Sequence, residues 1–293
     1  MIDNRFLKPS RPLRDIELPT LRAMIIPTVA EAVNIFGPTV DRPVPLVYQE
    51  LVFNESEENN AIELHLQVGC DSSLGYRGVA ILDLISHLAY NSAYNQLRTQ
   101  EQLGYIVSAY AKKMTGGSWG LSVIVQSSVA SPTVLEARSL AWLQMFRGEL
   151  AAMSEEILAT EASSVVAQLL ERDTKLSQEV VRAWGEILLT ETLPQSMRTP
   201  AFNRVQRIAQ ELLVGSGSIR SLKEDMLSFF DKYLSEQSSE RRVISARVYN
   251  RAGTEEYNQN VGKPGIVSSY EEIQGIKHHL GTWPITPYWS GSS

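Results

Sequence analysis

The sequence contains a single cysteine, Cys70, and no run of apolar residues long enough to cross a membrane. One thiol cannot form a disulfide within the chain, which favours a reducing compartment. A membrane-spanning helix needs about 20 consecutive apolar residues, and residues 1–15 contain no hydrophobic signal region. We therefore predict a cytoplasmic protein that does not contact a membrane.

Positive charge is also scarce. The net charge is −6 and the isoelectric point is about 5.4, whereas proteins that bind nucleic acid carry a basic patch or stripe. We therefore expect no nucleic-acid partner. The hydrophobic fraction of 43% is sufficient for an ordinary packed core. Cys70 follows the apolar alternation of a predicted strand, which indicates a buried structural thiol rather than a nucleophile.

The motifs of self-sufficient hydrolases are missing. A zinc site of the inverted kind needs H-x-x-E-H on a helix, but His87 is followed by Leu-Ala-Tyr-Asn. His278 and His279 are adjacent, so on a helix they point in different directions and cannot chelate one ion together. The serine motif G-x-S-x-G is absent, and residues 215–218 lack the spacing of a phosphate loop. The sequence therefore predicts no cofactor and no metal ligand in this segment.

The strands are predicted by alternation. Ala61 to Val68 alternates polar and apolar residues, as a half-buried strand does. One strand is expected to begin with Leu51 and Phe53, and another is expected over Val243 to Tyr249. Between them, Tyr105 to Ala111 and Trp119 to Gln126 are predicted to pair through a turn at residues 116 and 117. A hairpin requires antiparallel pairing, so the sheet contains antiparallel strands.

The helices are predicted by apolar spacing and by capping residues. Residues 71–73 are expected to form a turn, and a long helix should follow from Tyr76 to Leu103, with Gly104 as its stop. Pro27 suits the first position of a short helix that ends at Gly37. Five further helices are predicted near residues 131–152, 154–172, 177–189, 202–213 and 221–233, and a short helical piece near 270–279. The fold class is therefore α+β, with helices packed on one face of the sheet.

One stretch resembles a known family closely. Residues 95–105, Asn-Gln-Leu-Arg-Thr-Gln-Glu-Gln-Leu-Gly-Tyr, are similar to a signature of the insulysin and pitrilysin family of inverted-zincin metallopeptidases. The signature belongs to the last of that family's four homologous domains. Further similarity follows in the same order along the chain, in residues 120–127, 171–187, 222–233 and, more loosely, 266–284.

The resemblance implies an architecture. Family members consist of two halves that close around a chamber, and the zinc ion is bound in the N-terminal half. This chain would then hold the closing helix and linker of the preceding domain in residues 1–45, the inactive fourth domain in 46–250, and a C-terminal extension in 251–293. Its expected partners are the zinc-bearing half and peptide substrates, and a homodimer is left open. A chain that starts at this point of the architecture is expected to be a fragment or a naturally split subunit.

The resemblance also implies the site. Arg98 and Tyr105 match positions at which family members contact the substrate beside zinc. A guanidinium and a phenol are suitable donors for the negative oxygen that forms during peptide hydrolysis. Without the resemblance, an arginine at a helix end would be expected to bind a nearby acid, and a strand tyrosine to pack. Glu101 and Gln102 are expected to position the helix.

Three functions follow from these observations. The first is a catalytically degenerate part of a zinc metalloendopeptidase, inactive alone, which closes the chamber and contributes Arg98 and Tyr105. The second is a stand-alone, non-catalytic peptide-binding or scaffold module. The third is a self-sufficient hydrolase, which the missing metal ligands disfavour. Retention of both donors favours the first, because a pure scaffold does not need them.

Overall fold

The computed structural model describes residues 22–37, 43–114, 116–191, 202–213 and 221–284. Its centre is a six-stranded mixed sheet with the strand order β3-β4-β2-β5-β1-β6. The strands are β1 (Leu46–Leu51), β2 (Asn60–Cys70), β3 (Ile106–Lys113), β4 (Ser118–Ser127), β5 (Arg242–Tyr249) and β6 (Ile266–Val267). Strands β3, β4, β2 and β5 pair antiparallel, and β1 runs parallel to both β5 and β6. The predicted α+β class is confirmed. The strand that was expected to begin with Leu51 instead ends there, because its pairing with β5 runs over Leu46–Leu51.

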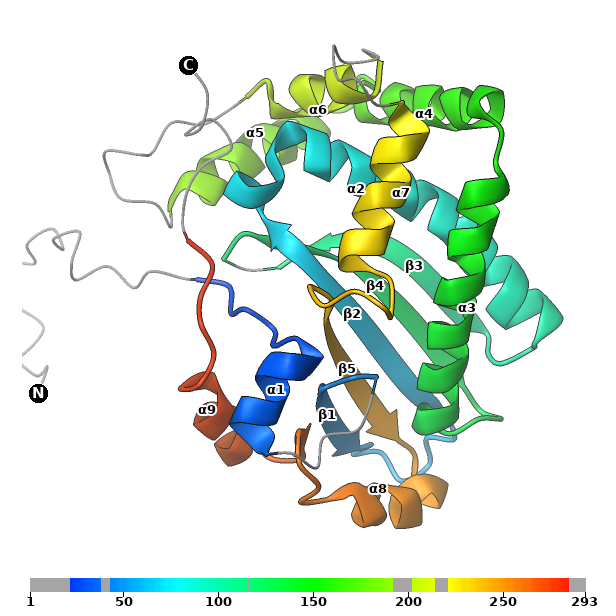
Figure 1. The fold of residues 1–293 in the computed structure, drawn as a ribbon, viewed down its shortest axis with the longest axis vertical. Coiled ribbons are helices and arrows are strands. Elements are labelled where there is room, and N and C mark those ends of the chain that lie inside the picture. The colour runs from blue at the N-terminus through cyan, green and yellow to red at the C-terminus, as the bar shows by residue number, and fades with distance from the viewer. Residues whose placement is uncertain (1–21, 38–42, 115, 192–201, 214–220, 285–293) are drawn as a thin grey trace, which may run out of the picture.

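Helices cover one face of this sheet (Figure 1). The longest, α2 (Asp71–Ala93), continues into a π-helix, η3 (Tyr94–Gln100), and packs with α3 (Pro132–Ala152) and α7 (Leu222–Tyr233). Helices α4 (Glu155–Leu169) and α6 (Arg204–Leu213) pack against α2, and α5 (Leu176–Glu191) lies between α4 and α6 along the chain.

The helix-covered face is apolar because alternate strand residues point towards it. Leu64 on β2 lies opposite Val123 on β4, and both are fully buried, whereas β5 places the polar but equally buried Ser245 beside Leu64. One ion pair is buried at the same face, where the Arg247 guanidinium donates to both carboxylate oxygens of Glu136 on α3, at 2.9 and 2.7 Å. This bidentate geometry satisfies two charges that burial would otherwise leave unpaired.

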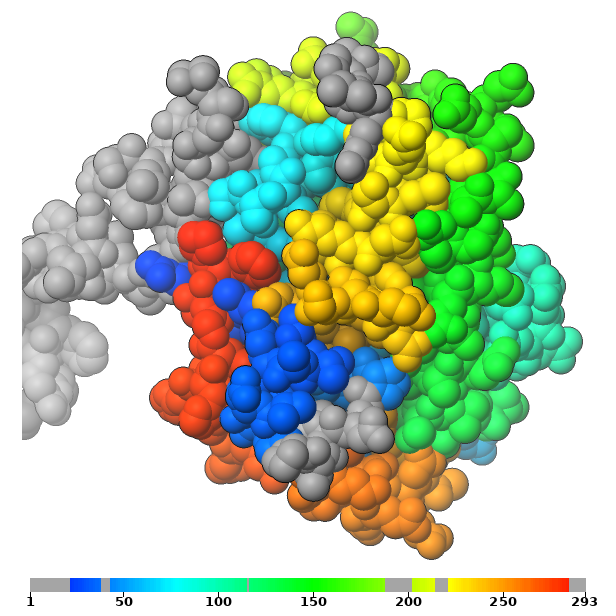
Figure 2. All heavy atoms as spheres, viewed as in Figure 1, coloured from blue at the N-terminus to red at the C-terminus, as the bar shows by residue number. Residues whose placement is uncertain are grey.

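The opposite face is bordered by the two ends of the described chain. Residues 23–25 run beside residues 281–283, joined by the bridge between Met24 and Thr282. Helix α1 (Val29–Phe36) lies beside α9 (Tyr270–Lys277), which Figure 2 shows as neighbouring blue and red atoms, and both line one shallow depression. Glu31 on α1 accepts from Arg242 at 2.6 Å, which ties α1 to the start of β5.

Local capping signals place the helices as predicted. Ser131 precedes the α3 helix, whose first residue is Pro132. Ser221 and Glu224 form the predicted capping box of α7. Pro27 differs, because Thr28 is the cap of α1 and the proline precedes it instead of opening the helix.

The predicted start of the long helix agrees with the structure, and the predicted stop was wrong. The residues from Asp71 form a separate turn, because Gly75, with φ of 59°, breaks the helix just before Tyr76. Gly104 is not the stop, because the left-handed residue is Gln102, with φ of 53°. Position 104 requires glycine because the backbone there passes close to β4. A Cβ at this position would lie 1.9 Å from the Gln126 carbonyl oxygen.

The C-terminal region contains two elements that were not predicted. Besides α9, it contains α8 (Thr254–Asn260) and strand β6, which extends the sheet beyond β1. Residues 215–218, which lack the spacing of a phosphate loop, lie outside the described residues. No helix within the described ranges has the length and apolar character needed to cross a bilayer.

Candidate functional site

The candidate site lies where the long helix ends and β3 begins. The helix changes to π geometry over Tyr94–Gln100, and Leu97 is its fully buried anchor. The Glu101 amide donates to the Gln96 carbonyl at 2.9 Å, a five-residue step that widens the last turn. Such π segments are rare and often occur at functional sites. Here the wider turn changes the direction of the side chains that leave the helix end.

Arg98 and Tyr105 are brought together at this end. The guanidinium carbon of Arg98 lies 4.7 Å from the ring centre of Tyr105 and 4.7 Å from that of Tyr94. Tyr94 in turn stacks on Tyr90, with ring centres 6.5 Å apart. The tyrosine faces therefore hold the cation by electrostatic attraction without neutralising it.

This arrangement leaves the donors available. Tyr105 is 80% exposed, and no carboxylate among the described residues forms an ion pair with Arg98. The nearby acid Glu101 accepts from Arg138 on α3 at 2.6 and 2.7 Å. Hydrogen bonding from Arg138 lowers the pKa of Glu101, so this carboxylate is ionised and already bound. Glu101 thus braces the helix end against α3 and does not bind Arg98.

Sequence reasoning missed Tyr94 and Tyr90. Both were visible as a spacing of four, because Tyr90, Tyr94 and Arg98 follow one another at i, i+4 and i+8 along the helix. Residues four apart lie on the same side of a helix. The spacing could therefore have predicted that Arg98 lies against aromatic rings.

The histidines do not form a metal centre. His87 Nε2 lies 2.9 Å from Glu161 Oε2 on α4, and His65 Nδ1 lies 2.8 Å from the Ser122 hydroxyl on β4. Burial lowers the pKa of His65 to about 4, so this ring is neutral at physiological pH. Across the described residues, no three or more His, Cys, Asp or Glu side chains come together in a way that could hold a metal ion.

A second feature is a groove with a volume of about 630 Å³. It lies on the face of the sheet opposite the helix-covered one, which we call the open face. It is mainly apolar, and its polar residues include Glu63, His65 and Gln67, which are the polar half of the alternation in β2. Burial works to raise the pKa of Glu63, but hydrogen bonds from Lys112 and Ser122 outweigh it and lower the pKa. The groove therefore has an apolar floor and an ionised, partnered carboxylate.

The groove is lined by residues of the sheet and of both chain ends: Arg22, Ala23, Met24, Ile26, Leu46, Tyr48, Glu63, His65, Gln67, Lys112, Met114, Ser118, Ile244, Ala246, Val267, Ile273, Ile276, Lys277 and Leu280.

Comparison with known proteins finds similarity over the segment that contains Arg98 and Tyr105. The family model of the C-terminal lobe domain 4 of PQQ synthase PqqF-like proteins matches residues 84–184, a range that includes both Arg98 and Tyr105. The chain is 30% identical to the insulin-degrading enzyme-like 1, peroxisomal, of Arabidopsis thaliana over 79% of its own length. It is 29% identical to the insulin-degrading enzyme of Homo sapiens over 70% of its length.

The similarity covers only part of each relative. The chain spans 22% of the Arabidopsis protein and 18% of the human one, about a fifth of the relatives' length. The crystal structure of pitrilysin superimposes on 81% of this chain and 23% of pitrilysin, with a TM-score of 0.60 and 19% identity. At that identity the superposition describes the fold.

Proposed function

Since the chain belongs to the insulysin and pitrilysin family and corresponds to its C-terminal region, we propose that it is a catalytically degenerate part of a zinc metalloendopeptidase. In this proposal it closes the chamber over a peptide substrate, and its own contribution to the chemistry is Arg98 and Tyr105. It is inactive alone.

The observation that supports this proposal most is the state of Arg98. Its guanidinium lies between two tyrosine rings and has no acidic partner among the described residues, while the Tyr105 side chain is 80% exposed. A cation and a phenol fixed beside each other are preorganised to donate to a developing oxyanion. Because the rings already restrict the arginine, less rotamer freedom is lost when substrate binds.

The side chains of the described residues form no group that fits zinc. His87 occupies the long helix without a second histidine one turn away, and its Nε2 already contacts Glu161. In the proposal the zinc ion belongs to a separate N-terminal half, where it would supply an activated water and polarise the carbonyl. The residues of this chain bind the peptide, orient it and donate hydrogen bonds.

The partners follow from the same proposal: the zinc-bearing half and peptides, with a homodimer left open. A cytoplasmic location stays a prediction that rests on the single cysteine. One relative carries the word peroxisomal in its name, and that location is said of the relative alone.

Complementation tests the proposal. The 293-residue chain is mixed with the zinc-bearing half of a family member, and cleavage of a fluorogenic peptide is followed. We expect no cleavage by either part alone, restored cleavage in the mixture, and loss of restored cleavage with Arg98→Ala. The exposed Arg172→Ala serves as the matched control and should restore activity fully. Cleavage by this chain alone, or equal activity of the two variants, would contradict the proposal.

A stand-alone peptide-binding module is the second candidate, and the groove on the open face of the sheet favours it. Such a module would bind peptides in the groove without any need for Arg98. The same experiment distinguishes the two, because a binding module captures peptide, fails to complement the zinc-bearing half, and is insensitive to Arg98→Ala.

A further inference from the structure

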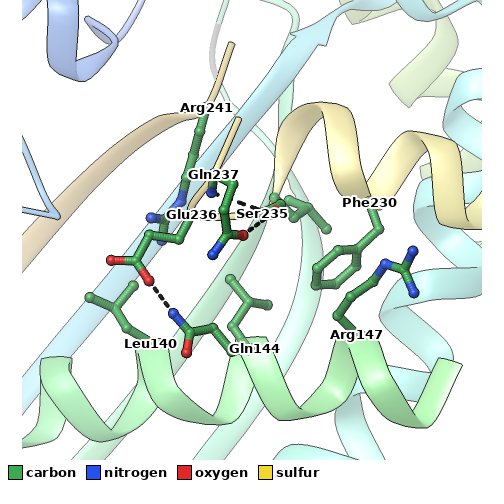
Figure 3. A pocket seen from close by; sticks show the side chains of 10 residues that line it. Leu140, Gln144, Arg147, Phe230, Ser235, Glu236, Gln237 and Arg241 are labelled. Carbon is green, nitrogen blue, oxygen red and sulfur yellow. Dashed lines mark hydrogen bonds between the residues drawn. The ribbon is translucent and has the colours of Figure 1, made fainter. Parts of the chain in front are cut away.

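A separate cavity lies on the helix-covered side of the domain, between α3, the end of α7 and the segment that leads into β5 (Figure 3). Its volume is about 210 Å³, larger than the roughly 150 Å³ cavity that accommodates benzene in a well-studied case. Leu140, Leu143, Phe230 and Leu234 make its apolar wall, and Gln144, Arg147, Ser235, Glu236, Gln237 and Arg241 supply its polar groups.

Arg241 is the unusual group in this cavity. The residue is only 5% exposed, and its Nε atom is buried without a hydrogen-bond partner. Neither a hydrogen bond nor an ion pair joins its side chain to any other residue that the structure describes. Burial lowers the pKa of Arg241, against the opposing charge of Glu236. A buried charge without a partner is costly, and proteins normally pair it.

Arg247, six residues further on, is an equally buried arginine whose charge is paired with a carboxylate. It is also 5% exposed, and it donates two hydrogen bonds to Glu136. The other cavity arginine, Arg147, is paired as well, because it donates to both carboxylate oxygens of Asp231 at 2.6 and 2.7 Å. Arg241 therefore keeps its donors for a group from outside the described chain.

We infer that this cavity binds a carboxylate carried on a short apolar body, with Arg241 as the carboxylate ligand. The guanidinium fork matches a carboxylate in shape and charge, and the leucine and phenylalanine wall suits a branched or aromatic body. A single unpaired cation and the nearby carboxylate of Glu236 favour a monoanion over a phosphate, whose charge is higher.

Glu236 is the carboxylate of this chain that could compete with a ligand for Arg241. Its carboxylate is exposed and accepts a hydrogen bond from Gln144 on α3, as Figure 3 shows. In the inferred complex it stays at the rim and repels the ligand weakly. The rival arrangement has Glu236 turn inward and serve as the permanent partner of Arg241.

Two sources share this ligand chemistry: the C-terminal residue of a peptide, and a free short-chain monocarboxylic acid. N-acetyl-leucine represents the first source and 4-methylpentanoate the second. The neutral N-acetyl-leucinamide is the matched control, because it keeps the apolar body and lacks the charge.

The test is a titration of the full chain with each compound, followed by calorimetry or by amide chemical shifts. At least one acid should bind about tenfold or more tightly than the amide, and whichever acid binds better identifies the source. Arg241→Met should abolish binding, Arg172→Met should leave it unchanged, and Glu236→Gln should tighten it. If Arg241→Met does not fold, Arg241→Lys replaces it, and the comparison of acid with amide in the unmodified chain answers the same question.

Several results would overturn the inference. Equal binding of acid and amide, or no saturable binding of either acid, would contradict a carboxylate site. Binding that survives Arg241→Met would place the ligand elsewhere. A fall in thermal stability with Glu236→Gln, together with unchanged or weaker binding, would mean that Glu236 is the true partner of Arg241. None of these outcomes depends on peptidase activity.

Discussion

Arg98 and Arg247 occupy two regions of one domain and are held in opposite ways. Arg247 lies at the helix-covered face of the sheet, where it is 5% exposed and binds both oxygens of Glu136. Arg98 lies at the end of the long helix, between two tyrosine rings and without an acidic partner among the described residues. The donors of Arg247 are occupied by Glu136. The guanidinium of Arg98 is held in position by the rings, and its donors can still bind a substrate. Aromatic faces position a cation without using up its hydrogen bonds.

Removing Arg247 should have the largest effect on stability. Arg247→Met leaves the Glu136 carboxylate buried and unpaired, so we expect a loss of about 3–5 kcal/mol in the free energy of unfolding. Urea denaturation measures it. The double change Arg247→Met with Glu136→Leu should recover much of the loss, because no buried charge remains. A single Arg247→Met change that costs less than about 1 kcal/mol would mean that the pair is not buried in solution.

The open face of the sheet provides a second test, through His65. Burial lowers the pKa of this ring to about 4 in the folded chain, compared with 6.5 for an unperturbed histidine. Between those values the unfolded state binds more protons, so the contribution to stability is complete above about pH 6.5 and is lost as the pH falls to about 4. The total is about 3 kcal/mol.

The measurement is the free energy of unfolding of the wild-type chain and of His65→Gln across this pH range. Glu63 and Lys112, the charged groups that act on His65, remain in both proteins. The difference between the two curves therefore isolates the imidazole. Parallel curves would show that His65 titrates normally and is hydrated.

The smallest effect on stability is expected at Tyr94. Tyr94→Leu removes one of the two rings against Arg98, and a partly exposed cation–π contact is worth about 0.5–1 kcal/mol. We expect a stability loss within that range, but a roughly tenfold fall in complemented kcat/KM, because Arg98 is less well positioned. Tyr94→Phe keeps the ring and should preserve both quantities. Equal kinetics for the two variants would contradict a positioning role.

Local signals made much of the fold predictable. The alternation of β2 and β5, and the caps Ser131 and Ser221, depend on residues close in sequence, so their elements were placed within a few residues. Strand β6 was missed because its two residues carry no pattern of their own, and their conformation depends on pairing with β1. Gly104 was misread because the carbonyl that it approaches belongs to Gln126, in the neighbouring strand.

The two residues of the candidate site were chosen from the sequence, and their role stays a prediction. Arg98 and Tyr105 were singled out by a family resemblance, and the structure brings their side chains together. The π-helix that sets their geometry has no residue signature, and the φ of 53° at Gln102 could not be expected of a residue other than glycine. The sequence could not predict that Arg241 is unpaired. Arg241 and Arg242 are adjacent and of the same type, and only the elements that pack on them in the fold distinguish them.

Kinetics of Arg98→Ala and Tyr105→Phe in the complemented enzyme test the central claim most directly. Loss of one donor to an oxyanion typically reduces the rate by about 100-fold to 1000-fold. We expect a fall of that size in kcat/KM for each variant, with unchanged binding of the zinc-bearing half. The melting temperature should be unchanged in Tyr105→Phe, whereas Arg98→Ala should lose about 1–2 kcal/mol of stability because it removes both cation–π contacts. Wild-type kcat/KM in both variants would contradict the claim that this chain donates to the chemistry.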